Sequence, residues 1–170
     1  HRGDQTGGNG MVASATGRLA LMAIHPCYAD GILEGRKQVE FRKRPLAADV
    51  KIVVIYSTAP IQRIVGAFTI SETVIGSPDE IWQKFGDVGL IERSKYEAYY
   101  ADSQRAVALV VERVFPVEGG LPLKALNPSP TAPQSFSYLS HSQASTLCRY
   151  ISGAEVQQTL FDDVALCAVR

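Results

Sequence analysis

The sequence is short of the residues from which metal sites and disulfide frameworks are built. Its 170 residues include three cysteines and three histidines, and no two cysteines form a CxxC pair. Structural zinc sites take Cys and His at close spacing, and disulfide scaffolds usually hold an even number of cysteines. We therefore expect no metal site and no disulfide framework, with the cysteines packed as small core residues. The same scarcity favours a reducing, cytoplasmic compartment.

An excess of charge of one sign is also absent, because 17 Lys and Arg residues balance 17 Asp and Glu residues. A protein that binds nucleic acid through its overall field is basic, so phosphate binding here requires a local cluster. No apolar run approaches the roughly 18 residues of a membrane helix. The glycine patterns of nucleotide-cofactor sites are missing as well. We expect neither a membrane partner nor a cofactor.

What remains is typical of a globular domain, with 46% hydrophobic residues. Residues 1–17 are Gly-rich and polar, which indicates a flexible tail. Residues 18–170 are then expected to form one domain that ends in a Pro-rich loop and a helical extension.

The apolar pattern predicts long strands between short helices. Strands are expected over residues 19–24, 37–44, 51–56, 63–75 and 105–117, the last broken at Pro116. Helices are expected after Pro26, as a pair over 78–101 with Ser77 and Glu80 in a capping box, and over 142–151 with Ser142 as cap. Long strands with few crossovers favour a small curled sheet or barrel with helices on its rim.

The most informative stretch is GRKQVEFRKR, residues 35–44, which holds six ionisable side chains in ten positions. Val39 and Phe41 alternate with polar residues, and this period of two predicts a strand with one packed face and one charged face. Entered through a glycine turn, such a strand suits an anionic, planar ligand.

Each charged residue of this strand has a functional and a structural interpretation. Lys37 would bind phosphate or act as a general base, or else cap a helix end at the surface. Glu40 would accept from an exocyclic amine of a base, or form a salt bridge. Arg42 would bind phosphate in bidentate fashion, or pair with Glu40.

Other candidates lie outside the strand. His25, at a strand end, would shuttle a proton or cap the following helix. Ser57 and Thr58 face the cleft or form a plain turn, and the tyrosines at 96, 99 and 100 stack a base or fill the core. The expected nucleic-acid contacts are His25, Lys37, Glu40, Arg42, Arg44, Ser57, Thr58 and Tyr100, with Lys37 and Glu40 as catalytic candidates.

These segments resemble the ASCH domain family. The resemblance rests on IHPCYA at residues 24–29 and ILEGRKQVEFR at residues 32–42, supported by IYSTAP at 55–60, IVGAF at 64–68 and the strand over 105–115. PQSFSY at residues 133–138 is similar to a tail of longer bacterial and phage members. The resemblance implies an α+β fold, a PUA-like mixed β-barrel of about five or six strands with peripheral helices.

The resemblance also implies a cleft beside the glycine turn for RNA, DNA or a modified nucleoside. Some relatives are amidohydrolases acting on N4-acetylcytidine, in which a lysine after the turn, a threonine three positions later and a distant glutamate do the chemistry. Lys37 matches the lysine, whereas Glu40 stands at the threonine position, and the distant acid falls within residues 87–97. We therefore expect a nucleic-acid or nucleotide binding module first, and a hydrolase or ribonuclease as the alternative.

Overall fold

A mixed, curled sheet of six strands forms the body of the protein in this computed structural model, which describes residues 18–151. The strands stand in the order β2-β5-β4-β3-β1-β6. Their bounds are β1 (Leu19–Ile24), β2 (Val39–Arg42), β3 (Ile52–Ser57), β4 (Arg63–Gly76), β5 (Ala106–Leu121) and β6 (Phe136–Tyr138). Of these neighbours, β1 and β3 pair in parallel and the others are antiparallel.

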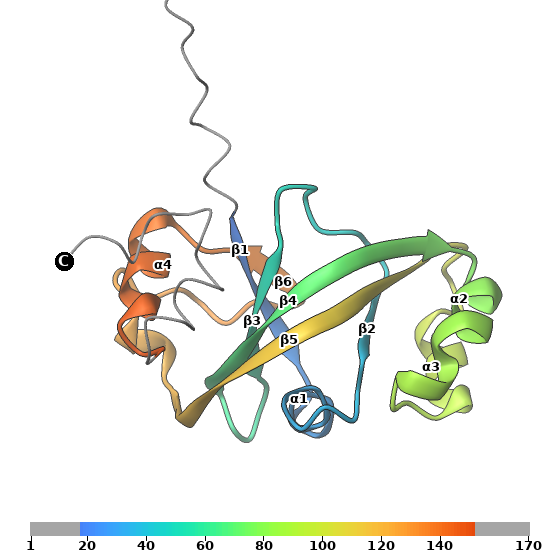
Figure 1. Ribbon diagram of the computed structural model, residues 1–170, viewed down its shortest axis with the longest axis horizontal. Helices are drawn as coiled ribbons and strands as arrows, with labels where there is room; N and C mark the ends of the chain where they lie inside the picture. The colour runs from blue at the N-terminus through green and yellow to red at the C-terminus, as the bar shows by residue number, and fades with distance from the viewer. Residues whose placement is uncertain (1–17, 152–170) are drawn as a thin grey trace, which may run out of the picture.

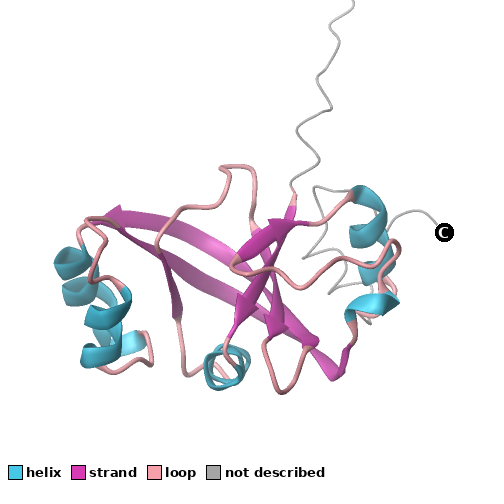
Figure 2. Ribbon diagram, turned by 180° about the vertical axis from the view of Figure 1, so that it is seen from behind, coloured by secondary structure: helices cyan, strands magenta, loops and turns pink. Residues whose placement is uncertain are grey.

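Helices lie at the periphery of this sheet. They are α1 (Pro26–Leu33), α2 (Pro78–Phe85), α3 (Arg93–Tyr99) and α4 (His141–Cys148), with 3-10 turns η2 (Gly86–Val88) and η3 (Leu123–Ala125). α2 and α3 sit at one end of the long β4–β5 ribbon and α4 sits at the other (Figure 1), as the view from behind also shows (Figure 2). The predicted α+β class, a mixed sheet with peripheral helices, is confirmed. No helix in the described residues is long and apolar enough to span a membrane.

The curl of the sheet comes from irregular pairing along β4. The register between β4 and β5 shifts at three places, and the register between β3 and β4 shifts at Ile55 and Tyr56. Such bulges bend a strand and increase its twist. Gly66 lies at one of them, where an added Cβ would come within 2.7 Å of Leu33 and 2.8 Å of the Phe115 carbonyl oxygen. A side chain at this position would clash with both groups, so the close approach requires glycine.

An aromatic cluster fixes α3 against the edge strand β2. The ring of Tyr96 lies 5.0 Å from Phe41 and 4.8 Å from Tyr100, and all three residues are buried. The Tyr100 hydroxyl donates to the carbonyl oxygen of Arg42 at 2.7 Å. These contacts fix the position of α3 relative to β2 and so define the space between them.

Tyr96 should make the fold sensitive to alkali. Burial raises the pKa of Tyr96 to about 12, whereas a tyrosine in an unfolded chain ionises near pH 10. The stability that this shift contributes is fully present below pH 10 and is lost as pH rises through 12. Tyr96→Phe should cost about 1 kcal/mol at pH 8, because it removes a 2.7 Å hydrogen bond to Pro78. In urea unfolding, the gap between the two proteins should narrow as pH approaches 12; a constant gap would contradict the assignment.

Several boundaries differ from the sequence prediction. The break at Pro116 is wrong, because β5 continues to Leu121 and Pro116 lies opposite Gly66 at a bulge, where proline is tolerated. The capping box at Ser77 is confirmed. The later helix begins at His141 and is capped by Ser140, so the predicted cap at Ser142 is wrong.

The expectation for the cysteines also fails in part. Cys148 is buried as expected, but it is disulfide-bonded, which the odd number of cysteines did not indicate. Cys27 is a free thiol and is exposed rather than packed in the core. Its position in the first turn of α1, on the side away from the sheet, leaves it in contact with solvent. The predicted tail over residues 1–17 and the extension after residue 151 lie outside the described residues.

Candidate nucleic-acid site

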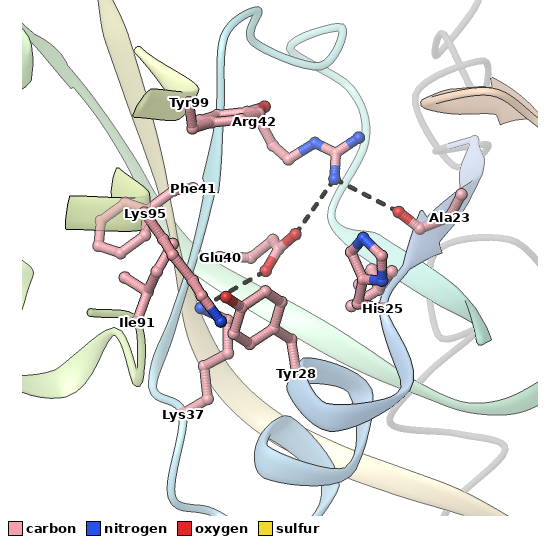
Figure 3. Close-up of a pocket in the computed structure, with 11 residues that line it drawn as sticks. Ala23, His25, Tyr28, Lys37, Glu40, Phe41, Arg42, Ile91, Lys95 and Tyr99 are labelled. Carbon is pink, nitrogen blue, oxygen red and sulfur yellow. Dashed lines mark hydrogen bonds and ion pairs between the residues drawn. The ribbon is translucent and has the colours of Figure 1, made fainter. Parts of the chain in front are cut away.

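A cavity of about 270 Å³ lies between the end of β1, α1, β2 and α3. Figure 3 shows the side chains that surround it, with charged groups from β2 pointing inward. Its floor is formed by Lys37, Glu40, Phe41 and Arg42, and its rim includes His25, Tyr28, Lys95 and Tyr99.

The glycine turn after α1 places Lys37 beneath that helix. Gly35 has φ of +81°, a left-handed conformation that lets the chain reverse at the helix end. The backbone N–H groups of Arg36 and Lys37 both donate to the carbonyl oxygen of Gly31 at 2.9 Å. The turn therefore directs the Lys37 side chain back into the protein instead of into solvent.

Lys37 is almost fully enclosed, with 2% of its surface exposed. Its ammonium group donates to the carbonyl oxygen of Gly89 and lies 3.8 Å from Glu40. It also lies 4.8 Å from the ring centre of Tyr28 and 5.2 Å from that of Phe41. Burial lowers the pKa of Lys37 below its ordinary range, and the nearby Glu40 carboxylate opposes part of that shift. The alternative of a surface lysine capping a helix is wrong.

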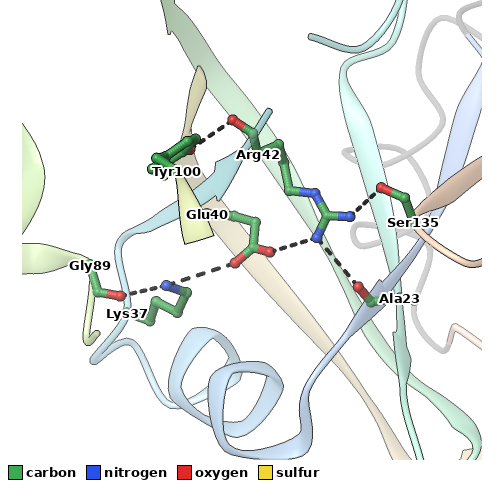
Figure 4. Close-up of polar contacts among 7 residues, drawn as sticks. All are labelled: Ala23, Lys37, Glu40, Arg42, Gly89, Tyr100 and Ser135. Atoms are coloured by element: carbon green, nitrogen blue, oxygen red, sulfur yellow. Dashed lines mark hydrogen bonds and ion pairs between the residues drawn. The ribbon is translucent and has the colours of Figure 1, made fainter. Parts of the chain in front are cut away.

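Glu40 connects Lys37 to Arg42. One carboxylate oxygen of Glu40 faces Lys37, and the other accepts from Arg42 at 3.2 Å. Arg42 also donates to the Ser135 hydroxyl at 2.6 Å and to the Ala23 carbonyl oxygen at 3.4 Å. Figure 4 shows this chain of contacts running across the opening. Because Ala23 belongs to β1 and Ser135 precedes β6, Arg42 joins the β2 edge of the sheet to its other edge.

The charged face of β2 is largely buried and faces the cavity. The Glu40 side chain is 7% exposed and that of Arg42 is 12% exposed. The alternation of the strand is as predicted: Val39 and Phe41 pack against α2 and α3, whereas Glu40 and Arg42 line the cavity. The charged groups of Glu40 and Arg42 therefore lie in the cavity.

The floor carries an uncompensated positive charge. Lys37 and Arg42 contribute two positive charges and Glu40 one negative charge, which leaves one positive charge in a site with little water. Lys95 at the rim is exposed and forms no ion pair within residues 18–151. Charge interactions are stronger in such a site than in bulk water, so it favours an anionic group.

The structure brings together some of the residues expected in the site. His25, Lys37, Glu40 and Arg42 line the cavity. The others do not: Ser57 is 2% exposed at the end of β3, Tyr100 is 3% exposed in the core, Thr58 is half-buried in the turn after β3, and Arg44 points into solvent beyond β2. Tyr100 cannot stack a base from this position, because its neighbours enclose the ring.

Sequence analysis missed two residues of the rim, Tyr28 and Lys95, and named Tyr99 only as one of three tyrosines that stack a base or fill the core. Lys95 and Tyr99 lie four positions apart on α3 and so share one face of that helix. That spacing was a usable signal, but the sequence did not show which face of α3 would meet the cavity.

Comparisons with known proteins agree with this architecture, although no protein-family model matches the chain. An ASCH domain-containing ribonuclease from Zymomonas mobilis is 27% identical over 139 residues, covering 80% of this chain and 94% of the relative. The crystal structure of ASCH from Zymomonas mobilis superimposes with a TM-score of 0.73 at 26% identity, covering 79% of this chain and 96% of that one. The chain is therefore similar to ASCH domain proteins in both sequence and fold.

A crystal structure of a single-residue mutant of the Zymomonas mobilis ASCH protein gives a similar match to this chain. It has a TM-score of 0.74 and 25% identity, and it covers 80% of this chain and 98% of that one. The family resemblance inferred from residues 24–42 is therefore confirmed.

Proposed function

We propose that this chain binds single-stranded RNA by taking one nucleotide into the cavity between α1, β2 and α3. The observation that carries the proposal is the buried, net-positive cluster of Lys37, Glu40 and Arg42 on the cavity floor. The name of the Zymomonas mobilis relative, a ribonuclease, supports RNA as the ligand.

The size of the cavity favours a single extruded nucleotide. Its volume of about 270 Å³ lies near the lower end of ligand pockets, which are typically about 300–1,000 Å³. Bases of a duplex are stacked and paired, and sequence-specific RNA recognition usually targets unpaired bases. The rings of Tyr28 and Tyr99 provide aromatic surfaces at the entrance.

The chemistry of the floor assigns a role to each charged group. Arg42 neutralises phosphate, to which a guanidinium group is well matched. Glu40 accepts a hydrogen bond from the exocyclic amine of a base, as carboxylates do with cytosine. Both of its oxygens already have a partner, but each carboxylate oxygen has two lone pairs and can accept again.

Lys95→Ala provides the direct test of RNA binding, because Lys95 is exposed at the rim and has no part in the buried cluster. Binding of short single-stranded RNAs should weaken about fivefold, alike for all sequences, with the salt slope reduced by about 0.7. The measurement is a salt titration of fluorescence anisotropy. Lys51→Ala is the matched control, since Lys51 is also exposed but lies away from the cavity.

Three results would contradict this proposal: no RNA binding by wild type at low salt, equal losses for Lys95→Ala and Lys51→Ala, or tighter binding of duplex than of single strands. DNA of the same sequence and free N4-acetylcytidine serve as competitors. Stronger competition by either one would identify the ligand as DNA or a modified nucleoside.

RNA cleavage is the second candidate function, and the lowered pKa of Lys37 favours it. An amine form of Lys37 would take the proton of a ribose 2′-hydroxyl as that oxygen attacks the adjacent phosphorus. The bond from phosphorus to the 5′-oxygen then breaks, and the proton passes to the leaving oxygen. End-labelled RNA should be cut, whereas the same sequence with 2′-deoxyribose should remain whole. Saturable binding without product would leave the binding function alone.

A further inference from the structure

We infer that Lys43 and Tyr99 form an outer subsite that holds the nucleotide adjoining the one in the cavity. The inference rests on the proposed RNA binding of the cavity and extends it from one nucleotide to two. Lys43 directly follows Arg42, and Tyr99 lies at the cavity rim.

Tyr99 links the cavity to the surface outside it. Its side chain lines the cavity, and the residue is 37% exposed. The Lys43 ammonium lies 4.9 Å from the centre of the Tyr99 ring. One ring therefore meets both the cavity and a cation that is not part of the cavity lining.

The Tyr99 ring is held in place by its neighbour in the core. It makes an edge-to-face contact with Tyr100 at 4.7 Å, and Tyr100 is anchored by its hydrogen bond to the Arg42 carbonyl oxygen. An exposed aromatic side chain that is already fixed loses little freedom when a base stacks on it. Every base has an aromatic face, so stacking here would tolerate any sequence.

Lys43 supplies a second cation next to Arg42, as a second phosphate requires. It directly follows Arg42, the last residue of β2. Arg42 points into the cavity (Figure 3), whereas Lys43 is exposed. Within residues 18–151 Lys43 forms no ion pair, so no carboxylate there neutralises its charge. Its ammonium group contacts the Tyr99 ring.

Affinity for ligands of different length tests the outer subsite. The probes are cytidine 3′-phosphate, which fills the cavity alone, and the dinucleotides CpAp and ApCp, each ending in a 3′-phosphate, which place the extra nucleotide and a second phosphate on either side. One of the dinucleotides should bind about tenfold more tightly than the mononucleotide. Replacing its adenine by uracil should preserve most of the gain.

Lys43→Met should reduce dinucleotide affinity about fivefold and leave mononucleotide affinity unchanged. Lys51→Met is the control for loss of a surface charge, and it should change neither value. Two results would contradict the outer subsite but leave nucleotide binding in the cavity intact. In the first, the mononucleotide binds and no dinucleotide binds more tightly; in the second, Lys43→Met weakens both ligands equally. If the mononucleotide does not bind at all, the proposed function of the cavity is wrong, and the outer subsite falls with it.

Discussion

Lys37→Met is expected to lower the free energy of unfolding by about 3–5 kcal/mol. Methionine keeps most of the volume of the lysine stem, so the loss comes from the charge. Without the ammonium, the Gly89 carbonyl oxygen loses a donor and the buried Glu40 carboxylate keeps Arg42 as its remaining partner. Urea unfolding followed by circular dichroism measures the change.

Arg36→Met is the matched control for Lys37→Met. Arg36 is the preceding residue, and its ion pair with Glu34 is exposed on both sides. Its loss should change stability by less than about 0.5 kcal/mol. Combining Lys37→Met with Glu40→Gln should recover part of the stability, because no carboxylate is then left buried. If Lys37→Met is as mild as Arg36→Met, the charge of Lys37 does not hold the site together.

Arg42→Gln and Glu40→Gln should affect RNA binding in different ways. Arg42→Gln should weaken binding to all single strands alike, by about tenfold or more, and reduce the salt slope by about one. Glu40→Gln should instead shift the preference among bases by about 1–3 kcal/mol, with little change in the salt slope. The reason is that a cation neutralises phosphate in any sequence, whereas a carboxylate accepts from particular base edges.

The comparison uses salt titrations on oligonucleotides that differ at one base. Arg44→Gln is the control, because Arg44 is close in sequence to Arg42 but is exposed and does not line the cavity. Equal losses for Arg42→Gln and Glu40→Gln on every sequence would show that Glu40 only orients Arg42. An effect of Arg44→Gln as large as that of Arg42→Gln would remove the case for the cavity.

Local chemistry was readable from the sequence where it depends on neighbouring residues. The first strand has the predicted bounds, Leu19–Ile24, because an uninterrupted apolar run is followed by a proline suited to a helix start. The Ser77 cap followed from the spacing to Glu80. Gly35 and the charged strand after it carried the family resemblance, and with it the fold class.

The candidate site was only partly predictable, because it depends on the curvature of the sheet. Nothing in the alternation of β2 shows that Glu40 would be enclosed, since that follows from α1 and from bulges in a distant strand. Tyr100 and Tyr99 are adjacent in sequence, yet one fills the core and the other reaches the cavity. Their assignment depends on the angle at which α3 meets β2, which local patterns do not specify.

The two edges of the curled sheet are joined by the side chain of Arg42, not by backbone hydrogen bonds between strands. Its contacts with Ala23 and Ser135 cross from β2 to the opposite edge. A guanidinium group has five N–H donors, and three contacts of Arg42 are to protein groups. The distance between the two edges can therefore change when the Arg42 side chain rotates, without breaking any backbone hydrogen bond between strands. A ligand that contacts Arg42 would therefore bind where the sheet can open or close without loss of backbone hydrogen bonds.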